Sequence, residues 1–114
     1  RLCAQGRAYV VYALDEPSLF RVMFGESGRS ARDPAVHPPE LQRSSYDLLV
    51  ATTGAWVREQ GLAVDPSALA LTLWSGVHGV ARLSVDGAVP LGREATVVLV
   101  DRVTTALLAG ARAG

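Results

Sequence analysis

The stretch Leu73–Leu83, "LWSGVHGVARL", decides how the rest of this chain is interpreted. Its apolar residues recur at helical spacing, yet it holds two glycines beside a tryptophan and a histidine. Glycine costs about 1 kcal/mol relative to alanine inside a helix. Three explanations are therefore open: a catalytic or metal site, a close contact between helices, or the wall of a ligand cavity.

Helical periodicity extends along most of the chain on both sides of this stretch. We predict helices over 1–14, 18–24, 40–60, 66–85 and 91–111. Pro66 suits the first turn of a helix that Asp65 caps, and Gly61 ends the helix before it. Residues 26–39 mix glycine, serine, arginine and proline without a period, which predicts a loop. The β-branched run 96–103 continues at helical spacing, so the predicted fold is all-α with five helices.

The length and composition predict a single domain over 1–114, with a hydrophobic content of 49%. Eleven acidic and eleven basic residues balance, which argues against nucleic-acid binding by this chain itself. Cys3 is the only cysteine, so an internal disulfide and a cysteine-based zinc site are excluded. No apolar run or export signal indicates a membrane or secretion, and a cytoplasmic location is expected.

The last two predicted helices are apolar over more than one face. A helix with apolar residues around most of its circumference must be covered on several sides. We therefore predict a homodimer in which these two helices from each subunit form a four-helix bundle. The predicted interface residues are Leu73, Gly76, Val77, Val80, Leu99, Val100, Val103 and Leu107.

Trp74 and His78 are four residues apart, so their side chains share one face of a helix. No second metal-ligating residue is expected beside His78, and Ser75 lies off its face, so neither a metal site nor a catalytic residue is predicted. Two interpretations remain: a hydrogen-bonded core histidine, or one polar group in the wall of an apolar cavity. Residue chemistry alone favours the core histidine.

Two motifs carry a family resemblance. They are "GRAYVVYALDEPSLFRVMFG" at 6–25 and "LTLWSGVHGVARL" at 71–83. Together they resemble the C-terminal regulatory domain of TetR-family transcriptional repressors, in the subgroup with a Trp–His–Gly signature, here Trp74, His78 and Gly79. The resemblance implies an all-helical domain that dimerises through its last two helices and binds a small-molecule effector. It also implies that operator DNA is bound only by an N-terminal helix-turn-helix domain, which is expected to lie outside this chain. The use of arginine without lysine, with many Ala, Val, Gly and Leu residues, indicates a high-GC bacterial source.

The resemblance raises the cavity interpretation above the core interpretation. The effector is expected to be mostly apolar or aromatic and to release the full-length repressor from DNA. The predicted ligand-binding residues are Tyr12, Phe20, Met23, Phe24, Tyr46, Leu49, Trp74 and His78. No enzyme activity, cofactor or metal is predicted. The alternatives are a small helical metal-binding or enzymatic domain that uses His78, and a helical interaction module without a ligand.

Overall fold

The computed structural model describes residues 1–24, 39–88 and 90–114, and all their side chains except those of residues 23, 24 and 39–45. The described residues form helices and no strands, which confirms the predicted all-α fold. The helices are α1 (Leu2–Asp15), α2 (Pro17–Phe24), α4 (Pro39–Gln60), α5 (Pro66–Val85) and α6 (Arg93–Ala113). The predicted loop lies outside the described residues except for Pro39, which begins α4.

The helix ends follow local chemistry. The Asp65 carboxylate accepts a hydrogen bond from the Ser67 N–H at 3.3 Å, and Pro66 occupies the first turn of α5. Gly61 follows α4 with a φ of 65°, a left-handed conformation that glycine adopts without steric cost. Helix α6 begins two residues later than predicted, at Arg93, because the backbone is still extended at Gly92.

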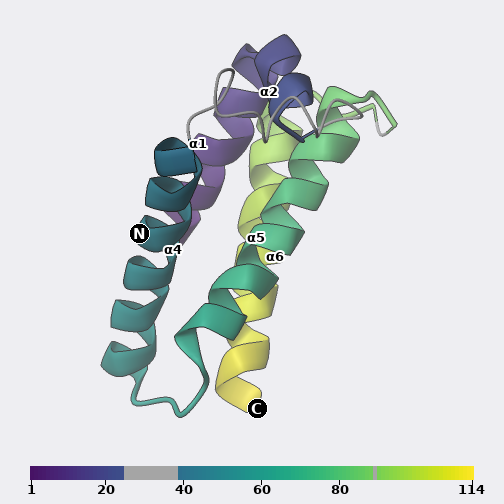
Figure 1. Ribbon diagram of the computed structural model, residues 1–114. Coiled ribbons are helices and arrows are strands. Elements are labelled where there is room, and N and C mark those ends of the chain that lie inside the picture. The colour runs from purple at the N-terminus through teal and green to yellow at the C-terminus, as the bar shows by residue number, and fades with distance from the viewer. Residues whose placement is uncertain (25–38, 89) are drawn as a thin grey trace.

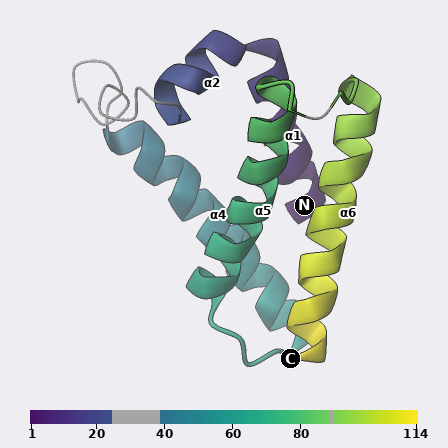
Figure 2. The same ribbon diagram turned by 90° about the vertical axis from the view of Figure 1, so that its right-hand side faces the viewer.

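Helices α5 and α6 lie side by side and antiparallel, and α1 packs against both of them (Figures 1 and 2). Helix α4 crosses α5 at an angle, and the short α2 lies across the end of α1 (Figure 2). Two apolar clusters hold the helices together. The first is built from Val10, Ala13, Phe20, Val77, Val80, Ala81 and Val100. The second, toward the other end of α5, is built from Leu2, Val57, Leu69 and Leu73.

Gly76 marks the point of close contact between α5 and α6 within one chain. A Cβ atom at this position would lie 2.7 Å from Val103 Cγ1 and 3.0 Å from Leu107 Cδ1. Around Gly79, by contrast, a Cβ atom would have nothing within 4 Å. The two glycines therefore differ: Gly76 is needed for packing inside the chain, whereas Gly79 lies on the open side of α5.

Most residues predicted to form the dimer interface also pack within the single chain. Leu73, Val77, Val80 and Val100 are buried by contacts within the single chain. The remaining members pack against the clusters or against Gly76 in the same chain. They are Leu99, Val103 and Leu107. The apolar stripe that suggested a partner subunit is thus largely covered by α1 and by the contact of α5 with α6.

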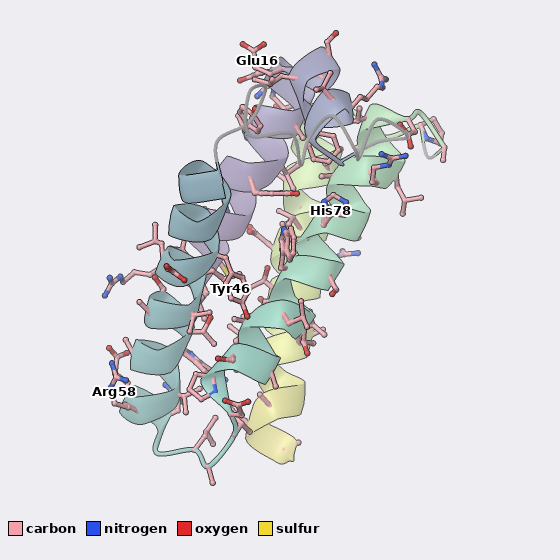
Figure 3. All side chains as sticks on the ribbon, in the orientation of Figure 1. Glu16, Tyr46, Arg58 and His78 are labelled. Atoms are coloured by element: carbon pink, nitrogen blue, oxygen red, sulfur yellow. The ribbon has the colours of Figure 1, made fainter. Side chains whose placement is uncertain are left out.

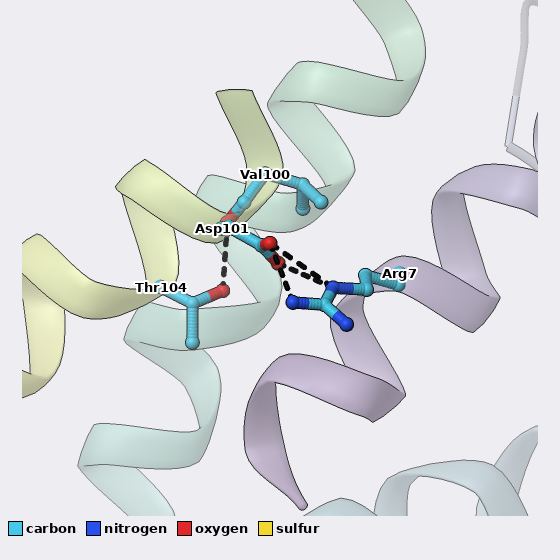
Figure 4. Close-up of polar contacts among 4 residues, drawn as sticks. All are labelled: Arg7, Val100, Asp101 and Thr104. Atoms are coloured by element: carbon cyan, nitrogen blue, oxygen red, sulfur yellow. Dashed lines mark hydrogen bonds and ion pairs between the residues drawn. The ribbon is translucent and has the colours of Figure 1, made fainter. Parts of the chain in front are cut away.

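Polar contacts fasten α1 to α6 at the surface. The Arg7 guanidinium binds both carboxylate oxygens of Asp101, with the shortest N–O distance at 2.7 Å (Figure 4). One turn further along α6, the Thr104 hydroxyl donates to the Val100 carbonyl at 2.9 Å (Figure 4). The ion pair is solvent-exposed and screened, so it orients the helices more than it stabilises them.

Candidate functional site

Three aromatic side chains from three helices meet around His78. The ring of Phe20 on α2 lies 5.5 Å from the His78 ring, centroid to centroid, and that of Trp74 lies 6.0 Å from it. Tyr9 on α1 meets Phe20 edge to face, with the centroids 6.1 Å apart and the planes at 81°. We call Tyr9, Phe20, Trp74 and His78 the aromatic cluster. Figure 3 shows His78 on α5, on the side toward α1 and α2.

A hydrogen-bond chain runs through this cluster. The Tyr9 hydroxyl and His78 Nδ1 are 2.6 Å apart. Trp74, whose indole N–H can only donate, also bonds to the Tyr9 side chain. The Tyr9 oxygen accepts from the Trp74 indole N–H, and the direction of the bond between the Tyr9 hydroxyl and His78 Nδ1 is set by the tautomer of His78.

Burial sets the protonation states of both partners. Burial raises the pKa of Tyr9 to about 12, although the hydrogen bond from Trp74 opposes the rise. Burial lowers the pKa of His78, and the positive charge of Arg82 lowers it further. Near neutral pH the phenol thus keeps its proton and the imidazole stays uncharged, as a donor–acceptor pair requires.

Stability is expected to depend on the protonation of His78. Because its pKa is lowered from the unfolded value of about 6.5, the unfolded chain takes up this proton first as the pH falls. The stabilisation is complete above that value and is lost progressively below it. Urea unfolding at about pH 7.5 and about pH 5.5 should show the loss, and His78→Gln should show a smaller one. Equal losses in the two proteins would contradict the assignment.

The structure brings together some of the predicted ligand-binding residues and not others. Phe20, Trp74 and His78 lie in the aromatic cluster. Tyr12 lies one turn from Tyr9 on α1 and has its pKa raised, first by burial and then by the Glu16 carboxylate. The side chains of the predicted residues Met23 and Phe24 lie outside the described part of the chain.

The other two predicted residues lie on α4. Tyr46 is 38% exposed, on the side of α4 that faces α5 (Figure 3). Leu49, one turn further along, is partly buried and packs against the second apolar cluster. Leu49 therefore joins α4 to the second cluster, whereas the described ring contacts of His78 come from α1, α2 and α5.

Gln5 and Tyr9 lie on the side of α1 that packs against other helices, and both make hydrogen bonds there. Neither was among the residues predicted from the sequence. Gln5, Tyr9, Tyr12 and Glu16 recur at helical spacing along one side of α1. That polar stripe is present in the sequence, but the hydrophobic ring of Tyr9 also fits the apolar spacing of α1. Its hydroxyl, not its ring, identifies it as the partner of His78.

The described residues contain neither a cluster of metal-binding side chains nor a helix that could span a membrane. No three histidine, cysteine, aspartate or glutamate side chains gather there in a way that could hold a metal ion. No helix among them has the length and apolar character that crossing a membrane requires.

Comparison with known proteins gives a family. No curated protein and no solved structure matches the chain significantly. The family model described as "Tetracyclin repressor-like, C-terminal domain" matches residues 2–107, nearly the whole chain. The helical architecture described above is consistent with that match. The chain therefore belongs to the tetracyclin repressor-like (TetR-like) C-terminal domains, a family of transcription regulators.

Proposed function

We propose that this domain senses a small, mostly apolar or aromatic effector and dimerises, and that the effector releases the full-length regulator from operator DNA. The observation that carries the proposal is the aromatic cluster, with its hydrogen-bond chain through Tyr9 and His78. Binding sites for small molecules are mostly apolar and contain a few oriented polar groups, which is the composition of this cluster. A ligand that binds the DNA-incompetent state more tightly than the competent state would shift the equilibrium between them.

The elements that meet in the cluster also support coupling between effector and helix packing. Phe20 belongs to α2, Tyr9 to α1 and His78 to α5, so a ligand that separates these rings would alter the contacts among all three helices. Helix α5 in turn contacts α6 at Gly76. A displacement of the His78 side chain is therefore transmitted through packed side chains to the outer faces of α5 and α6.

A thermal-shift screen of apolar and aromatic compounds tests effector sensing, since binding raises the melting temperature. Hits should also change the fluorescence of Trp74 when it is the sole tryptophan, in the variant Trp56→Phe. Trp56 is a suitable residue to remove because it contacts Arg112 and the second apolar cluster, away from His78. In the full-length regulator, a hit should weaken operator binding. If His78→Gln loses stability but binds the hits unchanged, a role of His78 in the site is refuted.

For the dimer we propose the outward faces of α5 and α6, which we call the α5–α6 face. Its residues are small or apolar except for one arginine, and they are exposed or half-buried. They are Ala68, Thr72, Ser75, Gly79, Leu83, Val98, Arg102, Thr105, Ala106 and Ala109. Small side chains allow helices of two subunits to approach closely, and exposed Leu83 and Val98 supply apolar area for burial.

Two shallow hollows on the α5–α6 face support the same proposal. One shallow hollow between α5 and α6 is lined by Ala68, Thr72, Ala106 and other residues. A second follows α6 and is also lined by Ala106, together with Val98 and Arg102. Ala106 thus borders both hollows, which makes it the natural position at which to test the interface.

Ala106→Arg is expected to convert a dimer into a monomer, raising the dimer dissociation constant by about 100-fold or more, because a buried charge without a partner is costly. Analytical ultracentrifugation of the wild-type protein and the variant measures this. The matched control is Ala51→Arg on the exposed side of α4, which should leave the dimer intact. A wild-type protein that remains monomeric at high concentration would refute the dimer, and a dimeric Ala106→Arg protein would refute this face.

A further inference from the structure

Two buried polar atoms lack a hydrogen-bond partner among the residues that the structure describes. They are Gln5 Oε1 on α1 and Thr53 Oγ1 on α4. A buried polar atom without a partner destabilises the folded state, so native proteins rarely keep one without a reason. Gln5 Nε2 donates to Thr52 Oγ1 at 3.0 Å across the contact between α1 and α4, and Thr53 is the next residue along α4.

The orientation of the Gln5 amide follows from the bonds of Thr52. The Thr52 hydroxyl donates its proton to the Leu48 carbonyl at 2.9 Å, so toward Gln5 it can only accept. The Gln5 group that faces Thr52 must therefore be the NH₂ group. The amide oxygen is left pointing away from Thr52, as an acceptor that requires a donor.

Thr53 is unlike the other buried threonines of the described residues. Thr52, Thr96 and Thr104 each donate to the carbonyl four residues earlier, at 2.8–2.9 Å. This bond is the usual way in which a helical threonine satisfies its hydroxyl. Thr53 is 0% exposed, yet its hydroxyl makes no such bond. The hydroxyl is thus a donor and an acceptor held inside the domain without a partner from the described residues.

These atoms lie in a polar layer, Gln5, Thr52 and Thr53, that is flanked by apolar and aromatic side chains. One turn along α1 from Gln5 is Tyr9 of the aromatic cluster. Leu49 and Tyr46 precede Thr53 by one and two turns on the same face of α4, and the half-exposed Tyr46 lies toward solvent.

We propose that this polar layer binds the hydroxyl group of an uncharged aromatic effector, such as a phenol. The ligand hydroxyl donates to Gln5 Oε1 and accepts from the Thr53 hydroxyl, which satisfies both buried atoms. A charged group is excluded, because Gln5, Thr52 and Thr53 carry no charge that could compensate a buried ion. This inference rests on the proposed effector-sensing function and names the chemical class of its ligand.

Titration of the ¹⁵N-labelled protein with phenol, anisole and toluene, followed by NMR, tests the proposal. These compounds have similar rings, but phenol can donate and accept, anisole can only accept, and toluene can do neither. Phenol is expected to bind about tenfold more tightly than either analogue, since each analogue leaves buried atoms unsatisfied. The amide signals around Gln5 and Thr53 should shift on addition of phenol.

Thr53→Val replaces the hydroxyl by a methyl group of the same size and should fold normally, because it removes an unsatisfied atom. It is expected to abolish the preference for phenol, and Gln5→Met should do the same. The matched control is Thr104→Val, which removes a buried hydroxyl on α6 and should keep the preference.

Equal affinities for the three compounds, no saturable binding of phenol, or a preference that survives Thr53→Val would each overturn the proposal. Equal affinities would mean that an ordered water molecule satisfies the two atoms and that the ligand hydroxyl plays no part. If all three compounds then change Trp74 fluorescence equally, effector sensing stands and only the hydroxyl site fails. Effector sensing itself fails when no compound of the wider screen binds at all.

Discussion

Replacing Phe20 by alanine is expected to lower the free energy of unfolding by about 3–5 kcal/mol. Phe20 is 0% exposed, and its ring contacts Tyr9 and His78. Among the described side chains of α2, a helix of eight residues, Phe20 is the one that belongs to the first apolar cluster. A helix of this length is not stable alone in water, so the loss of its anchor should release α2 as well as open a cavity.

Urea unfolding followed by circular dichroism measures the effect. Leu19→Ala is the matched control, because Leu19 precedes Phe20 on the same helix and is 48% exposed. It should cost less than about 0.5 kcal/mol, the usual range for surface positions. The His78 titration gives a second readout: removal of the Phe20 ring admits water, and the pKa of His78 should rise toward its ordinary value. A loss below about 1.5 kcal/mol would show that Phe20 does not anchor α2.

The two glycines of α5 are expected to respond to alanine in opposite directions. At Gly76 the new methyl group would meet Val103 Cγ1 at 2.7 Å and Leu107 Cδ1 at 3.0 Å, so α5 and α6 must separate. Overpacking of this kind costs about 1–3 kcal/mol, which exceeds the helix-propensity gain of up to about 1 kcal/mol. Gly76→Ala should therefore destabilise the protein.

Gly79→Ala should stabilise the helix by up to about 1 kcal/mol, because the methyl group has nothing within 4 Å. The free energies of unfolding of the two variants, measured under conditions where the protein is monomeric, provide the comparison. Working with monomer matters because Gly79 belongs to the proposed α5–α6 face, where a partner could contact the new methyl group. Variants with the same sign of effect would contradict the assignment of Gly76 to the contact within the chain.

The helices and their ends were largely predictable because their signals are local. Pro66 after the Asp65 cap begins α5, and Gly61 ends α4 in the left-handed conformation that its lack of a side chain permits. The difference at α6 was also local: the backbone at Gly92 is extended, so the helix starts at Arg93 and not at Leu91. Spacing within a helix also placed Trp74 and His78 on one face.

Which helices or subunits bury each apolar helical face could not be predicted in the same way. The stripe through Gly76, Val77 and Val80 is apolar whether it packs against a partner or against the same chain. Periodicity reports that a face is buried, but it does not report what buries it. In the structure this stripe packs against α1 and α6 of the same chain. We therefore place the proposed dimer surface on the smaller residues on the other side of α5.

By itself, the sequence determined the all-α class, the approximate extents of the helices, the resemblance to TetR-like domains, and the placement of Trp74 and His78 on one helical face. Only the tertiary structure decided that Gly76 serves a contact within the chain, that Tyr9 is the hydrogen-bond partner of His78 from 69 positions away, and that Thr53 keeps a buried hydroxyl without a partner among the described residues. The reason is physical. Helix formation depends on neighbours within about one turn, whereas close contacts and hydrogen bonds between helices depend on how whole helices dock.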